Sequence, residues 1–100
     1  MDQTAVINLL REYKVLLSRY YKLHSVYLFG SYARGTNRED SDIDVAVVVD
    51  KLEGDYLSYA PLLWKLRRQI DNRIEPVLFE TDKDPAGFLE EIKRTGIEIN

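Results

Sequence analysis

The chain has 100 residues, the size of a single domain with one hydrophobic core. It has no cysteine and one histidine, which excludes disulfides and clusters of thiolate or imidazole metal ligands, so any metal must bind oxygen atoms. The net charge of −3 excludes a broad attraction to nucleic acid, and no apolar run approaches the roughly 20 residues of a membrane span. We expect one cytoplasmic domain over residues 1–100, without strong nucleic-acid binding or membrane contact.

The N-terminal part of the chain predicts a helix, a strand and a short second helix. Apolar residues recur at intervals of three and four, which predicts an amphipathic helix over residues 3–21 that covers one face of a sheet. Residues 25–29 are largely aromatic and aliphatic and precede Gly30, so they predict the first strand. Residues 31–34 predict a short helix that ends in a glycine-containing turn, and a polar, exposed loop follows over 37–41.

The middle of the chain predicts a buried strand and a third helix. Residues 42–49 end in a continuous apolar run, which indicates a strand that is buried on both faces and lies in the centre of the sheet. A loop is expected over 51–55. Ser58 predicts the cap of a helix that runs to about residue 70, with Pro61 in its first turn, where a missing N–H costs little. The basic residues near its end suit the negative end of the helix dipole, with a partner contact as the alternative; they are Lys65, Arg67 and Arg68.

The C-terminal part predicts a third strand, a fourth helix and a short last strand. Residues 73–79 predict a strand, and because proline cannot donate to a ladder, Pro76 indicates either that this strand lies at a sheet edge or that the proline stands at a position without a ladder bond. The pair Asp84-Pro85 predicts a helix start, and Gly96 predicts the end of that helix. Residues 97–99 predict the last strand, and the buried face of the helix is expected to comprise Phe88, Leu89 and Ile92. Strands that alternate with helices indicate an α/β fold of the α+β type, with a small mixed β-sheet flanked by about four helices.

One motif in the chain carries chemistry. It consists of Gly30-Ser31 after an apolar run, then ten residues, then Asp42-Ile43-Asp44 at the start of a second apolar run. Side chains alternate along a strand, so Asp42 and Asp44 point to the same face and can hold a hard divalent cation. A Gly-Ser turn between a strand and a helix offers N–H groups and a hydroxyl to phosphate. Alone, a Gly-Ser pair more often just ends a strand, and two aspartates at a strand start are more often solvated or cap a turn. The two together at this spacing favour a site for a magnesium nucleoside triphosphate.

This motif resembles the signature of the minimal nucleotidyltransferases in the polymerase-beta-like superfamily. The segments Tyr32-Ala33-Arg34-Gly35 and Ser41-Asp42-Ile43-Asp44 resemble those of the MntA-type antitoxins, which pair with HEPN toxins. The resemblance covers nearly the whole chain. It implies a nucleotidyltransferase core that uses ATP as substrate and two Mg²⁺ ions.

The resemblance also implies roles for three carboxylates. Asp42 and Asp44 are expected to be shared Mg²⁺ ligands, and Glu75 is expected to complete one metal site and to be, or assist, the base. Many relatives have aspartate in place of Glu75, so the second metal and the base depend here on a longer side chain. Glu80 and Asp82 are weaker candidates for the same role.

Three further residues are expected to bind the triphosphate. Gly30 permits a close approach of phosphate to the backbone, and the Ser31 hydroxyl and N–H are expected to hold a β- or γ-oxygen. Arg34 lies one helical turn later and can offer its guanidinium to the phosphates. The alternative for Arg34 is an ion pair with Glu39 or Asp40.

The resemblance to MntA-type antitoxins implies an enzyme that transfers AMP from ATP to a tyrosine of a HEPN ribonuclease toxin. A domain of this length has little room to bind an acceptor, which favours a protein acceptor and a hetero-oligomer with it. Two alternatives stay open: a non-catalytic antitoxin that only covers its toxin, and the small catalytic subunit of an enzyme that modifies small molecules. Tyr32 and the exposed tyrosines are candidates for contact with a partner.

Overall fold

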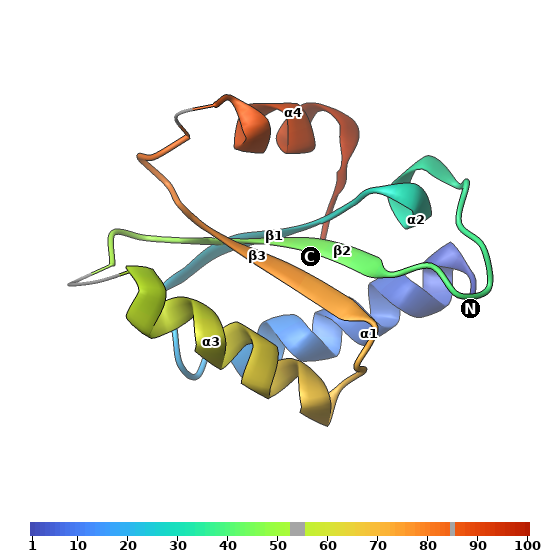
Figure 1. Cartoon of the computed structure of the whole chain (residues 1–100), viewed down its shortest axis with the longest axis horizontal. Coiled ribbons are helices and arrows are strands. Elements are labelled where there is room, and N and C mark those ends of the chain that lie inside the picture. Colours follow the sequence, from blue (N-terminus) through green and yellow to red (C-terminus); the bar gives the residue numbers. More distant parts are fainter. Residues whose placement is uncertain (53–55, 85) are drawn as a thin grey trace.

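The computed structural model describes residues 1–52, 56–84 and 86–100, with the backbone only at 56 and 57. The described elements are α1 (Gln3–Leu17), β1 (Leu23–Phe29), α2 (Ser31–Arg34), β2 (Ile43–Val49), α3 (Tyr56–Leu66), the 3-10 helix η1 (Arg67–Gln69), β3 (Ile74–Glu80), α4 (Phe88–Thr95) and β4 (Ile97–Glu98). Figure 1 shows α1 and α3 on one face of the sheet, α4 on the other face and α2 beyond the end of β1. This arrangement confirms the predicted α+β fold. Within these ranges, no helix combines the length and the apolar character that crossing a bilayer requires.

The four described strands form a mixed sheet in the order β3-β2-β1-β4. β2 pairs in parallel with β3 and antiparallel with β1, and β4 pairs antiparallel with the other side of β1. The prediction of a central strand is confirmed, although β2 begins at Ile43 and leaves Asp42 just ahead of it. Of the two possibilities for Pro76, the edge strand is the one found, because β3 is the last strand on its side of the described sheet.

The hydrophobic core lies between the sheet and the helices α1 and α3. Alternate residues of β2 enter this core, namely Ile43, Val45, Val47 and Val49. Full burial of such a side chain contributes about 1.5 to 3 kcal/mol, so the four together fix which face of β2 points inward. The residues between them, including Asp44, therefore face the opposite side of the sheet.

Two tyrosines connect α1 and the turn after it to α3. The Tyr13 hydroxyl donates to the carbonyl of Leu63 at 2.8 Å, and the Tyr21 hydroxyl donates to the carbonyl of Tyr59 at 2.6 Å. Burial raises the pKa of Tyr13 above its ordinary value and the pKa of Tyr21 to about 12, so both hydroxyls remain donors. α1 ends at Leu17, four residues earlier than predicted, and the turn after it brings Tyr21 to α3.

Helix α3 differs from its prediction at both ends. It begins at Tyr56, so Ser58 is its third residue and does not cap it, and Pro61 lies inside the helix, where it removes one helical hydrogen bond. Serine occurs in first turns as well as at caps, so the residue type alone did not fix the start. The α-helix ends at Leu66, and η1 tightens the chain before it turns toward β3. The loop predicted before α3 lies outside the described residues at 53–55.

Helix α4 begins later than the Asp84-Pro85 pair predicts. Its first residue is Phe88, preceded by Gly87 with a φ of 69°. The Asp84 carboxylate still accepts hydrogen bonds from two N–H groups of the first helical turn, each at 2.9 Å, so it caps the helix from further away. Pro85 lies outside the described residues, and Gly96 ends the helix as predicted.

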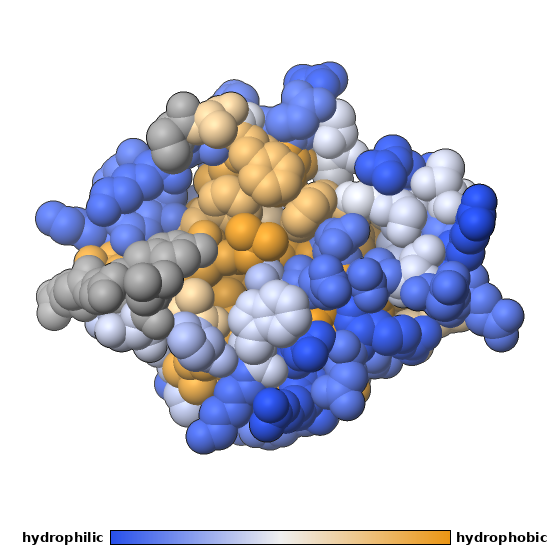
Figure 2. Space-filling model, viewed as in Figure 1, coloured by the Kyte–Doolittle hydropathy of each residue, from blue (hydrophilic) through white to orange (hydrophobic). Residues whose placement is uncertain are grey.

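The buried face of α4 is narrower than predicted. Leu89 and Ile92 are each 2% exposed, but Phe88 is 45% exposed, so its predicted burial is wrong. At the first helical position its ring instead packs edge-on against Phe29 and Phe79, with centroids 5.7 Å apart in both pairs. Figure 2 shows apolar surface gathered just below α4.

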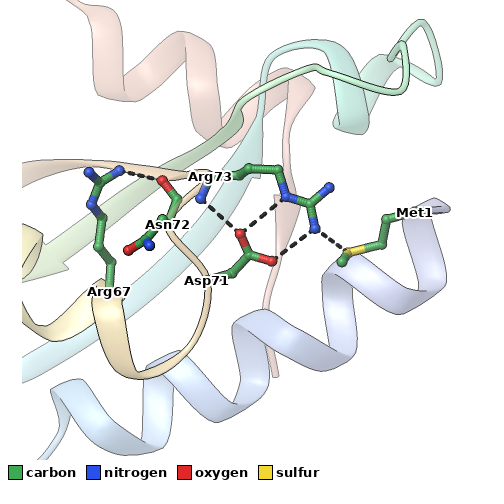
Figure 3. A network of polar contacts seen from close by, with 5 residues as sticks. All are labelled: Met1, Arg67, Asp71, Asn72 and Arg73. Carbon is green, nitrogen blue, oxygen red and sulfur yellow. Dashed lines mark hydrogen bonds and ion pairs between the residues drawn. The ribbon is translucent and has the colours of Figure 1, made fainter.

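Two arginines hold the turn that leads into β3 (Figure 3). The Arg73 guanidinium donates to both carboxylate oxygens of Asp71, at 3.1 and 2.9 Å, and the Arg73 backbone N–H donates to the same carboxylate at 2.8 Å. These hydrogen bonds and the charge of Arg73 hold the pKa of Asp71 below its ordinary value. Arg67 donates from Nη1 to the carbonyl of Asn72 at 2.6 Å. The turn is therefore a fixed structure rather than a loose connection.

Asp71→Asn is expected to lower the free energy of unfolding by about 1 kcal/mol at neutral pH, because asparagine loses the charge-assisted bonds to Arg73. The pKa of Asp71 is lowered in the folded state, so its stabilisation is present above the unfolded value of about 4 and is lost as the pH falls through the folded value. Urea unfolding over a series of pH values measures the difference, which shrinks in acid. Asp40→Asn, in an exposed loop, is the control. A difference that does not change with pH would contradict the assignment.

Candidate active site

β1 ends in a turn that requires glycine. Gly30 has a φ of 74°, and a β-carbon added there would overlap the carboxylate of Asp44. α2 follows at once over Ser31–Arg34, as predicted, and Gly35 ends it with a φ of 73°. The backbone of the Gly30 turn therefore lies directly against Asp44.

The sheet register brings the three predicted carboxylates to one end of the sheet. The parallel pairing of β2 with β3 sets Asp44 opposite Glu75, and Asp42 stands one residue before β2. Asp42 lies close enough to Glu75 to raise the pKa of that carboxyl group. On its other side Asp44 is paired with Phe29, the residue before Gly30. The glycine turn and the carboxylates therefore occupy one continuous site.

Like charges are crowded in this site. Burial, followed by the charge of Asp42, raises the pKa of Asp44, whereas the charge of Arg34 lowers it. Burial, followed by the charges of Asp42 and Asp44, raises the pKa of Glu75, whereas Arg67 lowers it. A bound cation would relieve this repulsion.

The chemistry of these side chains fits Mg²⁺. This ion binds carboxylate oxygens, commonly one or two from the protein, together with phosphate and water. As the side chains stand, no three acidic or histidine residues within the described ranges are grouped so that they could hold a metal ion. Asp42 and Asp44, with Glu75 beside them, could hold the ion if a triphosphate supplied the remaining oxygens.

α2 leaves two predicted phosphate-binding groups available. Ser31 is half-buried, and no residue in the described part of the chain is hydrogen-bonded to its hydroxyl. Arg34 is exposed and lies close enough to Asp44 for its charge to act on that carboxylate. In the same described ranges, Arg34 forms no ion pair with Glu39 or Asp40, which was the alternative.

Three other candidates do not reach this site. Glu80 lies at the opposite end of β3, about 17 Å from Glu75 at 3.3 Å per residue, and Asp82 lies beyond it. The predicted partner contact of Tyr32 is wrong, because its side chain is fully buried. Its backbone carbonyl accepts a hydrogen bond from Nε2 of Gln3 at 2.8 Å, which ties α2 to α1.

Arg67 is a neighbour of the site that sequence reasoning missed. Its charge acts on Glu75, after the larger effects of burial and the aspartates on that pKa. The only signal in the sequence was the basic cluster at the end of α3, which predicted a helix-end or partner role. No motif spacing relates Arg67 to Glu75, because their proximity depends on how the turn after η1 folds.

A cavity of about 230 Å³ lies at the other end of the sheet. Its lining consists of Tyr20, Tyr21, Lys22, Asp50, Lys51, Leu52 and Tyr59. Asp50 follows the last residue of β2, so the cavity is about 20 Å from Asp44 along the strand. The candidate site is therefore on the face of the sheet and not in this cavity.

Comparison with known proteins gives matches over the same region. A family model described as "Polymerase beta, Nucleotidyltransferase" matches residues 11–100. The protein adenylyltransferase MntA of Shewanella oneidensis is 36% identical over 78 residues, which cover 77% of this chain and 50% of MntA. The protein MJ1379 of Methanocaldococcus jannaschii is 47% identical over 55 residues, which cover 55% of this chain and 53% of that protein. The matches thus span about half the length of these two relatives.

A solved structure has the same fold. A chain in the crystal structure of a toxin-antitoxin with AMP-PNP superimposes with a TM-score of 0.66 and 28% identity, over 93% of this chain and 73% of that chain. The family model covers both halves of the Gly-Ser and Asp-Ile-Asp motif and all of the sheet. The chain therefore belongs to the polymerase beta nucleotidyltransferase family.

Proposed function

We propose that this protein is a Mg²⁺-dependent adenylyltransferase that moves AMP from ATP to a tyrosine hydroxyl of a HEPN ribonuclease toxin, with which it forms a hetero-oligomer in the cytoplasm. One observation carries the proposal. The pairing of β2 with β3 sets Asp44 opposite Glu75, and the pairing of β2 with β1 sets Asp44 opposite Phe29 and so places the Gly30 turn against the Asp44 carboxylate. Nucleotidyl transfer needs these two parts together, a turn that can bind phosphate and carboxylates that can bind metal.

Similar proteins support ATP as the donor of AMP and a protein as its acceptor. MntA is named a protein adenylyltransferase, and the similar toxin-antitoxin structure contains AMP-PNP, an analogue of ATP. The resemblance of residues 32–35 and 41–44 to MntA-type antitoxins supports a HEPN toxin and a tyrosine as the target. These findings favour a protein acceptor over a small molecule.

The three carboxylates have different roles in the proposed reaction. The acceptor oxygen attacks the α-phosphorus of ATP, the bond from that phosphorus to the bridging oxygen breaks, and pyrophosphate leaves. Asp42 and Asp44 are the residues that would hold Mg²⁺, which would supply positive charge beside the attacking and leaving oxygens. Glu75, set beside both aspartates, takes the proton of the acceptor hydroxyl.

The Gly30 turn and α2 orient the triphosphate. The absence of a side chain at Gly30 lets phosphate approach the backbone, and the Ser31 hydroxyl and N–H donate to a β- or γ-oxygen. Arg34 adds a charged, planar donor on the same side as Asp44. In this arrangement the leaving pyrophosphate is held by α2 while the carboxylates act on the α-phosphate.

Asp44→Ala and Asp42→Ala are each expected to reduce AMP transfer about 100-fold or more, because each removes a metal ligand and its charge stabilisation. Purified protein, partner toxin, Mg²⁺ and ATP are incubated, and the mass of the toxin is followed by mass spectrometry. Asp50→Ala, at the other end of β2, is the matched control and is expected to retain transfer. Circular dichroism checks that each variant is folded.

The same assay separates the proposal from its alternatives. Transfer that persists in Asp44→Ala would refute the metal-ligand role. A toxin that is neutralised while its mass stays unchanged would show occlusion without catalysis. AMP transfer to a small alcohol, with none to the toxin, would show a small-molecule enzyme.

Gly30→Ala is expected to weaken ATP binding and to destabilise the fold by about 1 to 3 kcal/mol, because it combines backbone strain with overlap on Asp44. Gly35→Ala is the comparison variant, since Gly35 has nearly the same φ but a ψ of 19°, in the left-handed helical region, against −152° at Gly30, and has no atom within 4 Å of an added β-carbon. Its cost is therefore the strain alone. Urea unfolding and calorimetric titration with MgATP measure both effects. Equal losses in the two variants would contradict a role for the close approach at Gly30.

A further inference from the structure

We infer that Arg67 is the residue that positions Glu75 beside the two aspartates. The inference rests on the proposed function, because it assigns a task to Glu75 that only nucleotidyl transfer gives it. Arg67 belongs to η1 and lies outside the Gly-Ser and Asp-Ile-Asp motif. Its contacts reach the strand that carries Glu75.

Arg67 holds the entry to β3 through two backbone carbonyls. Its Nη1 donates to the carbonyl of Asn72 at 2.6 Å and to the carbonyl of Ile74 at 2.8 Å. Ile74 is the residue immediately before Glu75, so the second bond fixes the peptide from which the Glu75 side chain extends. Figure 3 shows the Arg67 side chain directed to this turn from the end of α3. Hydrogen bonds from a charged donor are stronger than those from a neutral donor, which suits a positioning contact.

The guanidinium is itself held in place from the helix side. It lies over the ring of Trp64, with 4.5 Å from its central carbon to the ring centroid. The Arg67 carbonyl also accepts the N–H groups of Ile70 and Asp71, at 2.9 and 2.8 Å, so the backbone and the side chain of one residue both hold the turn. Arg67 is therefore fixed against α3 and η1 while its guanidinium is hydrogen-bonded to the start of β3.

Arginine at this position has one cost that an apolar residue would not have. Its Nε is buried and has no hydrogen-bond partner in the described part of the chain. Burying an unpaired N–H costs about 1 to 3 kcal/mol, which an apolar residue of similar size would avoid. What an apolar residue cannot supply is the pair of bonds to the carbonyls and a positive charge near Glu75.

The same turn is also tied to the strand that carries the aspartates. The carbonyl of Arg73 accepts the N–H of Ile43 at 2.9 Å, and Ile43 lies between Asp42 and Asp44. Arg67 thus fixes the turn on one side while Ile43 fixes it on the other. Glu75 leaves this turn with its carboxylate set against Asp42 and opposite Asp44. Arg67 is a positioning residue, since its contacts are to the backbone and not to the reacting atoms.

The test compares Arg67→Met and Arg67→Lys with Arg68→Met, a control that removes the same charge from an exposed neighbour. Binding of Mn²⁺ to the protein with AMP-PNP present, which supplies the phosphate oxygens, is measured by calorimetry, and kcat and the KM for ATP are measured from AMP transfer. We expect Arg67→Met to weaken Mn²⁺ binding and to lower kcat, each by about tenfold or more, with little change in KM. Arg67→Lys is expected to recover part of both losses, and Arg68→Met to show neither.

A double-substitution cycle with Glu75→Gln distinguishes positioning from general damage to the fold. If Arg67 acts through Glu75, Arg67→Met causes no further loss of Mn²⁺ binding or kcat in a chain that already carries Glu75→Gln. Losses that add in the double variant would overturn the inference, as would a neutral Arg67→Met. Urea unfolding checks each variant, and if Arg67→Met does not fold, the cycle is run with Arg67→Lys.

The single variant Glu75→Gln distinguishes a failure of the proposed role of Glu75 from a failure of the positioning role of Arg67. If Glu75→Gln leaves Mn²⁺ binding and kcat unchanged, the proposed role of Glu75 fails and the role of Arg67 fails with it. If Glu75→Gln lowers both while Arg67→Met does not, the proposed function stands and only the positioning role is refuted.

Discussion

The parallel pairing of β2 with β3 is the constraint on which the rest of the site depends. Four apolar residues of β2 point into the core between the sheet and the helices α1 and α3, and a shift of the strand by one residue would turn all of them to the other face of the sheet. With that facing fixed, Asp44 must point to the other side of the sheet, and the register sets Glu75 opposite it. The hydrophobic core thus determines where the acidic side chains meet.

The site holds an arrangement that opposes stability. Burial and then the charge of Asp42 raise the pKa of Asp44, burial and then the charges of both aspartates raise the pKa of Glu75, and Gly30 adopts a backbone conformation that other residues rarely use. These costs are small beside the burial in the core on the other face of the sheet. The division explains why one face of β2 is continuous hydrocarbon while the other begins with charge.

The sequence was sufficient wherever a local rule decides the outcome. The order of the elements, the central β2 and the glycine turn all followed from apolar patterning and residue type. Helix starts did not, because Ser58 and Asp84 can each act at more than one position near a helix start. Contacts between distant segments were also out of reach: Tyr32 is buried because α2 packs on α1, and Arg67 meets β3 only through a turn whose path no periodicity reveals.

The outer side of β3 has a consequence for how another polypeptide can approach. The Arg73 carbonyl faces β2, so in a parallel ladder the polar groups of Ile74 and Pro76 face away from the sheet. The Ile74 carbonyl already accepts a hydrogen bond from Arg67, and Pro76 has no N–H to donate. An incoming strand therefore finds no continuous row of backbone hydrogen-bonding groups next to Glu75, and recognition of another chain near this carboxylate must rely on contacts between side chains.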